Sequence, residues 1–348
     1  MRASVVIAAY RDAGYIEENV RKLAGDFEVI LAVDDPSEEL IGIARRYKLK
    51  VSMSNGRRGK WRALNDALKL VEGEYVIFLD SDTRLIELPE FKGDVIEFVK
   101  EVEGKGVLER LVNIDYFNMF LTAKLASRVN SCLSLNGAAF AAKREVVTKL
   151  GFRKFINEDT ELGIRVGLSG YRVRVDGRAV TRAPSRFGEW LAQRERWAVG
   201  GAEALLAHLR RVMVKPRLWL PYLFPFYPAI TGLAIALVLP DTIVLKLLYI
   251  LLPLLLLISP KFAPFALLTV FELHVLKNFI AVLAAFAIWS CVIALCSIKT
   301  SFKIDFRLLP LYFFFYSPLW TMICVAALLK VSVYKLLGRK MEVEDWKT

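Results

Sequence analysis

The sequence changes character near Pro216, and this change limits what the chain can fold into. Beyond it, four apolar runs come close to the ~20 residues that cross a bilayer, namely 218–239, 243–259, 279–298 and 309–329. Residues 1–214, in contrast, carry 35 Lys and Arg and 30 Asp and Glu, as a water-soluble domain does. The sequence therefore predicts a soluble domain over 1–214, ending in an amphipathic interface helix. A membrane domain of three to four helices, with a charged cytoplasmic tail, should occupy 215–348.

The overall composition agrees with a chain of two parts. A hydrophobic content of 55% is high for a soluble protein, whereas 24% charged residues is high for one embedded throughout. In 215–348, 13 basic residues face 6 acidic ones, which is typical of cytoplasmic membrane faces. We therefore expect membrane lipids as partners. Zinc-finger, RNP and helix-turn-helix signatures are absent from the sequence, so we expect no nucleic acid.

The first apolar run, residues 3–10, is too short for a signal peptide and is typical of a buried strand. The soluble domain is therefore expected in the cytoplasm, and the whole chain is expected to be integral to the cell membrane. Glutamine occurs once, at Gln193, while Lys, Arg and Glu are plentiful. This scarcity of thermolabile amides suggests a thermophilic source.

Residues 1–110 alternate short apolar runs with stretches of helical spacing. Such alternation predicts a parallel sheet with right-handed crossovers. Ligands bind such sheets beyond the carboxyl ends of their strands. Two acidic pairs lie at such ends, Asp34 with Asp35 and Asp80 with Asp82. This edge of the sheet is therefore the expected functional site.

Asp80 and Asp82 follow the apolar run YVIFL. Alternate residues leaving a strand point to one side, so their carboxylates can converge on one hard cation. A divalent ion held there could also neutralise a diphosphate leaving group. The alternative is a solvated turn, which is the commoner reading of an isolated pair of this kind.

Asp34 and Asp35 could accept hydrogen bonds from a nucleobase or ribose, or could belong to a helix cap near Ser37. Asp159, in the run NEDT, could act as a general base towards an acceptor hydroxyl. The alternative for that run is helix capping with dipole complementation. Both pairs of alternatives stay open from these residues alone.

Gln193, Arg196 and Trp197 lie at i, i+3 and i+4, on one face of a predicted helix. That face would offer an amide, a guanidinium for phosphate oxygens and a flat surface for a sugar ring. The alternative is an amphipathic helix anchored at the membrane interface. The two readings are compatible.

Seven segments taken in order carry a family resemblance: SVVIAAYRD, VDDPSE, GKWRALNDAL, LDSD, SLNGAAFAAKREVV, EDTEL and QRERW. Over residues 3–201 the chain resembles the membrane-bound family 2 glycosyltransferases. This group includes cellulose, chitin and hyaluronan synthases and polyprenyl-phosphate sugar transferases. The resemblance implies an α/β fold, with a Rossmann-like GT-A domain in the cytoplasm followed by a small α-helical transmembrane bundle.

The resemblance also implies a role for each matching residue. The nucleotide would contact Ala8, Tyr10, Asp34, Asp35 and Lys60. The metal, Mn²⁺ or Mg²⁺, would be held by Asp80 and Asp82. Asp159 would be the catalytic base, and the diphosphate and acceptor would contact Glu158, Gln193, Arg196 and Trp197. Trp346 would correspond to a gating-loop tryptophan.

The chain departs from the family pattern in its first strand motif. Ala8 replaces the usual proline and Arg11 the usual asparagine, which leaves the identity of the base open. We expect an inverting, metal-dependent enzyme that moves a sugar from a nucleotide diphosphate to a polyprenyl- or dolichyl-phosphate-linked acceptor. GDP-mannose is the favoured donor. The alternatives are a processive polysaccharide synthase that uses a UDP-sugar and, from another class, a membrane transporter with a regulatory nucleotide-binding domain.

Overall fold

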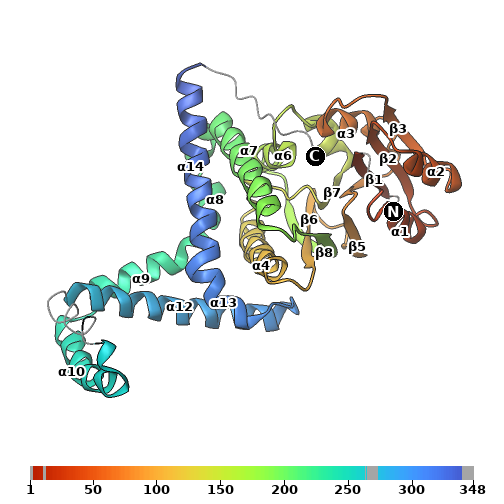
Figure 1. Cartoon of the computed structure of the whole chain (residues 1–348). Coiled ribbons are helices and arrows are strands. Elements are labelled where there is room, and N and C mark those ends of the chain that lie inside the picture. Colours follow the sequence, from red (N-terminus) through yellow and green to blue (C-terminus); the bar gives the residue numbers. More distant parts are fainter. Residues whose placement is uncertain (1–2, 11–12, 263, 265–272, 339–348) are drawn as a thin grey trace. The chain divides into compact units, whose positions relative to one another are not determined.

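The computed structural model describes residues 3–10, 13–262, 264 and 273–338 (Figure 1). The chain divides into two compact units. One contains the described residues up to Tyr222 together with those from Phe314 onward, and the other spans Leu223–Phe313. Each unit is described by itself.

The first unit is built on an eight-stranded sheet of order β3-β2-β1-β4-β7-β6-β8-β5. Its strands are β1 (Ala3–Tyr10), β2 (Glu28–Asp34), β3 (Lys50–Ser54), β4 (Tyr75–Asp80), β5 (Thr83–Glu87), β6 (Val95–Glu103), β7 (Ala139–Lys143) and β8 (Val173–Arg182). Strands β3, β2, β1 and β4 are parallel, and β7 runs antiparallel to both β4 and β6. The register pairs Ala8 with Asp80 and Tyr10 with Asp34, so the predicted acidic pairs lie at the carboxyl ends of β2 and β4, the two parallel strands that flank β1.

Helices cover both faces of this sheet. They are α1 (Ile16–Leu23), α2 (Glu38–Arg46), α3 (Lys60–Leu68), α4 (Val107–Arg128), α5 (Arg144–Leu150), α6 (Glu158–Ser169), α7 (Phe187–Met213) and α8 (Pro216–Trp219). Alternate residues of β1 enter two separate cores: Val5 packs with side chains of α1 and α2, and Val6 with side chains of α3 and α6. Burial on both faces explains why the strand reads as an unbroken apolar run.

The last helix of this unit, α14 (Ser317–Leu336), packs against α7 (Figure 1). Their contact is built from small and β-branched side chains, including Ala198 and Ala202 of α7 and Ala327 and Val331 of α14. Short side chains let the two helix axes approach closely. An apolar helix from the end of the chain therefore supports the helix that carries the motif QRERW.

The second unit is helical, with α9 (Tyr227–Val238), α10 (Asp241–Ile258) and α12 (Leu273–Thr300) as its main elements. Trp289 of α12 stacks on Tyr312, with ring centroids 5.7 Å apart. Its carbonyl oxygen accepts a hydrogen bond from the Tyr227 hydroxyl at 3.4 Å. Aromatic packing thus joins the elements of this unit.

Among the described residues, three helical segments are long and apolar enough to cross a membrane: Pro216–Val238, Leu276–Thr300 and Phe306–Leu336. The predicted segment 243–259 forms α10, which is not one of the three. The number of membrane crossings, three to four from the sequence, stays a prediction. A Rossmann-like α/β domain followed by apolar helices is the fold class predicted from the sequence, and it is confirmed.

Candidate active site

A pocket opens beyond the carboxyl ends of β1 and β4. It is lined by Ala8, Lys60, Leu64, Phe78, Leu79, Asp80, Gly137, Phe140, Phe152, Glu158 and Asp159. Five of these residues were predicted from the sequence to belong to the site. The structure therefore brings together side chains that lie up to 151 positions apart, from Ala8 to Asp159.

Lys60 is the most central charge of this pocket. Its Nζ lies 2.6 Å from Oδ1 of Asp80 and 3.4 Å from Oε1 of Glu158. Desolvation lowers the pKa of Lys60, but the charges of Asp80, Glu158 and Asp159 outweigh it, and the net shift is upward. The ammonium group is therefore charged and held between a strand end and the start of α6.

Asp80 and Asp82 flank the turn between β4 and β5. Desolvation and the negative charge of Asp80 raise the pKa of Asp82 to about 6, although this side chain reaches solvent. Asp82, whose ionisation the neighbouring Asp80 disfavours, is placed to gain from a cation that both carboxylates share. Within the described residues, no group of three or more His, Cys, Asp or Glu side chains is placed to hold a metal ion.

Glu158 and Asp159 begin α6. Glu158 is buried, and desolvation together with Asp159 raises its pKa to about 7 despite the opposing charge of Lys60. The N-cap residue Asn157 makes no side-chain capping bond, while Glu158 and Asp159 lie in the first turn, where the helix dipole favours acids. Instead the amide of Asn157 donates to the carbonyl oxygen of Trp197 on α7, at 3.0 Å.

The loop before β7 holds the Asp159 carboxylate. The backbone N–H of Gly137 donates to Oδ2 at 2.7 Å, and the N–H of Thr160 donates to Oδ1 at 2.6 Å. A Cβ at position 137 would lie 2.5 Å from Oδ2, so only glycine permits this approach. The N–H of Asp80 also donates to Ala138 in the same loop, which ties the loop to the end of β4.

Asp34 fastens the loop that precedes α3. Its Oδ2 accepts hydrogen bonds from the N–H groups of Arg58 and Gly59, at 2.7 and 2.8 Å. The cap of α2 is formed instead by Ser37, whose hydroxyl accepts from Leu40. Asp34 thereby sets where Lys60, the first residue of α3, enters the pocket.

Asp35 and Tyr10 lie at the same edge of the sheet. Asp35 has a left-handed backbone, with φ of 53°, and its N–H donates to the carbonyl oxygen of Ser54. The guanidinium of Arg57 lies 4.6 Å from the centre of the Tyr10 ring. Sequence reasoning did not single out Arg57 or Arg58; the signal that could have found them is the basic pair following a turn, directly before Lys60.

On α7, Gln193 and Trp197 are half-buried, whereas Arg196 is exposed. The buried arginine of the motif is Arg194, which sequence reasoning missed. Its Nη1 donates to Asp115 of α4 at 2.6 Å. Its guanidinium carbon lies 4.7 to 5.9 Å from the ring centres of Trp190, Trp197, Tyr316 and Trp320. Tryptophans four positions before and three after Arg194 mark this helix face in the sequence.

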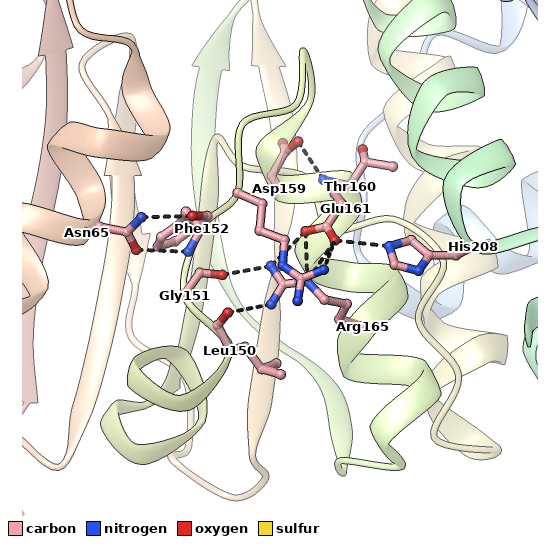
Figure 2. Close-up of polar contacts among 10 residues, drawn as sticks. Asn65, Leu150, Gly151, Phe152, Asp159, Thr160, Glu161, Arg165 and His208 are labelled. Atoms are coloured by element: carbon pink, nitrogen blue, oxygen red, sulfur yellow. Dashed lines mark hydrogen bonds and ion pairs between the residues drawn. The ribbon is translucent and has the colours of Figure 1, made fainter. Parts of the chain in front are cut away.

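A buried polar cluster holds α6 from behind the pocket (Figure 2). Glu161 is fully buried and accepts hydrogen bonds from Nε and Nη2 of Arg165 at 2.7 to 2.8 Å. His208 of α7 lies 3.0 Å from the same carboxylate. Arg165 also donates to the carbonyl oxygens of Leu150 and Gly151, so one side chain joins α6 to the end of α5.

Comparison with known protein families identifies the family to which this chain belongs. Residues 4–107 match "Glycosyl transferase family 2", and residues 75–333 match "Glycosyl transferase family group 2". The chain belongs to glycosyltransferase family 2. The predicted family is thus confirmed, and with it the prediction of a glycosyltransferase.

Individual relatives extend the comparison. The poly-β-1,6-N-acetyl-D-glucosamine synthase of Staphylococcus aureus (strain MSSA476) is 28% identical over 254 residues, which cover 64% of this chain and 58% of the relative. This chain therefore spans less than two thirds of that synthase. The probable glycosyltransferase YdaM of Bacillus subtilis (strain 168) is 25% identical, over all of this chain and 86% of the relative.

Among solved structures, a mannosyltransferase from Pyrobaculum calidifontis in complex with GDP-Man and Mn²⁺ shares the fold. The TM-score is 0.55 at 19% sequence identity, covering 97% of this chain and 88% of the other. The roles of the individual site residues stay predictions. Trp346, the predicted gating residue, lies outside the described residues.

Proposed function

We propose that this protein is an inverting, metal-dependent transferase that moves a sugar from a nucleotide diphosphate to an acceptor at the cytoplasmic face of the cell membrane. The observation that carries the proposal is the pocket that joins Lys60, Asp80, Glu158 and Asp159 beyond the carboxyl ends of the strands. Family membership supports this chemistry. The three apolar helical segments support a membrane location.

The carboxylate groups at the end of β4 fit a hard divalent cation as its ligands. Asp80 and Asp82 offer carboxylate oxygens, the ligands that Mg²⁺ and Mn²⁺ prefer. A cation bound by these two residues would supply the charge that stabilises a departing diphosphate. Lys60 provides a further positive charge beside Asp80, and its ammonium could bind a phosphate oxygen of the donor there.

Asp159 is the proposed base. It takes the proton of the acceptor hydroxyl while that oxygen attacks the anomeric carbon, and the bond from this carbon to the diphosphate oxygen breaks on the opposite face. The N–H groups of Gly137 and Thr160 orient the carboxylate for this step. An acceptor phosphate, already anionic, would need no base.

We infer GDP-mannose as the donor and a polyprenyl- or dolichyl-phosphate-linked acceptor. Support for the donor comes from the similarly folded mannosyltransferase that was solved with GDP-Man and Mn²⁺. A second candidate is a processive polysaccharide synthase that uses a UDP-sugar. The similarity to poly-β-1,6-N-acetyl-D-glucosamine synthase favours this alternative.

Thermal stabilisation of the detergent-purified protein by GDP and UDP, each with and without Mn²⁺, tests the proposal. A ligand that binds only the folded state raises the melting temperature, by an amount that grows with the logarithm of its concentration relative to its dissociation constant. We expect a metal-dependent rise with GDP that is absent from Asp80→Asn/Asp82→Asn. A rise with UDP alone, together with long polymer made from a UDP-sugar, would establish the processive synthase instead. No rise with either nucleotide would contradict both.

A further inference from the structure

Lys60 lies in the pocket among several carboxylates. Its ammonium lies 2.6 Å from Asp80 and 3.4 Å from Glu158, and the electrostatic influence of Asp159 also reaches it. Lys60 also lowers the pKa of Asp82, against the upward effects of burial and Asp80. One lysine thus interacts electrostatically with four carboxyl groups.

The fold sets where the backbone of Lys60 lies. Lys60 is the first residue of α3, and the loop before it is held by the two backbone hydrogen bonds to Asp34. Asp80 ends β4 and Glu158 begins α6, so the ammonium bridges two elements on either side of the pocket. The side chain keeps 30% of its surface exposed, which leaves it room to move.

A divalent cation held by Asp80 would meet this ammonium at close range. Two positive charges that share one carboxylate repel each other, and the repulsion is strong where water is partly excluded. Arrival of the metal therefore requires Lys60 to give up its contact with Asp80. A donor diphosphate beside the metal would offer the ammonium a new anionic partner at the same moment.

We propose that Lys60 is a built-in counter-cation that competes with the metal, so that the metal binds firmly only together with the nucleotide diphosphate. The inference rests on the proposed metal site and adds a coupling between metal and donor that runs through one side chain. Coupling of this kind is reciprocal: the nucleotide raises the affinity for the metal by the same factor by which the metal raises the affinity for the nucleotide.

The test is Mn²⁺ binding in the absence of any sugar donor, measured from the electron paramagnetic resonance signal of free Mn²⁺. Lys60→Met keeps an unbranched side chain, one atom shorter, and removes the charge. We expect it to bind Mn²⁺ about tenfold more tightly than wild type without nucleotide. The gain in Mn²⁺ affinity on adding GDP or UDP should be smaller in this variant than in wild type. Lys60→Arg, which keeps the charge, should stay within about threefold of wild type.

Lys69→Met is the matched control, because this lysine directly follows α3, is 74% exposed and pairs with Asp66, and neither residue lines the pocket. It should leave Mn²⁺ affinity unchanged. Equal or weaker Mn²⁺ binding by a folded Lys60→Met protein, with a melting curve like that of wild type, would overturn the inference. Failure of the proposed metal site looks different: Mn²⁺ binding in wild type would then be insensitive to Asp80→Asn/Asp82→Asn.

Discussion

The Glu161→Gln substitution removes the charge at the centre of the buried cluster behind the pocket. Glu161 has no exposed surface, and it is the carboxylate partner of Arg165, whose side chain is only 6% exposed. Breaking one side of a buried ion pair costs ~3–5 kcal/mol, because the other charge is left without compensation. Arg165 keeps its bonds to the carbonyl oxygens of Leu150 and Gly151, so we expect the lower end, about 3 kcal/mol.

A loss of that size should be visible in a thermal melt. For a folded unit of this length, 1 kcal/mol corresponds to roughly 2–4 °C in melting temperature, so the expected decrease is about 6–12 °C. Differential scanning fluorimetry of the detergent-purified protein measures it. The control is Glu195→Gln, whose carboxylate pairs with Lys330 at 3.7 Å while 63% exposed. An exposed pair contributes little, so the control should melt within about 2 °C of wild type.

A double variant separates the ion pair from simple loss of packing. Arg165→Met combined with Glu161→Gln removes both charges, and its destabilisation should be clearly smaller than the sum of the two single effects. If Glu161→Gln melts like the Glu195→Gln control, or if the two single effects simply add, the cluster is not the electrostatic support of α6 that its geometry indicates.

Three further substitutions test the site itself. Gly137→Ala should place a methyl group against the Asp159 carboxylate and lower kcat by about 100-fold at unchanged donor affinity. Steady-state kinetics and nucleotide titration measure the two quantities. An unaltered kcat would contradict the role of this loop in positioning Asp159. Asp34→Asn should weaken the two bonds to the loop before α3 and cost about 1.5 kcal/mol in a thermal melt, with weaker nucleotide binding by calorimetry. Asp115→Asn should leave Arg194 as an unpaired buried charge and lower the free energy of unfolding by ~3–5 kcal/mol. A melting curve like that of wild type would show that the surrounding aromatic rings are enough to stabilise the guanidinium.

Much of the site could be predicted because strand ends are readable from local pattern. An apolar run followed by LDSD places Asp80 at the carboxyl end of a parallel strand, and sheet topology then brings it beside the end of β1. Helical spacing likewise places Gln193 and Trp197 on one face of α7. These inferences need only the period of a strand and the period of a helix.

The partners of the charged residues could not be predicted in the same way. Which arginine of QRERW is buried depends on where α4 and α14 pack, and this selects Arg194 over Arg196. The role of Asp34 in holding the loop before α3 depends on the path of a turn that no local period describes. The sequence alone thus determined the family, the α/β class and the edge of the sheet where the candidate active site lies, because each follows from local periodicity and the order of motifs. Only the tertiary structure decided which charges meet, because burial and pairing arise from contacts between segments far apart in the chain.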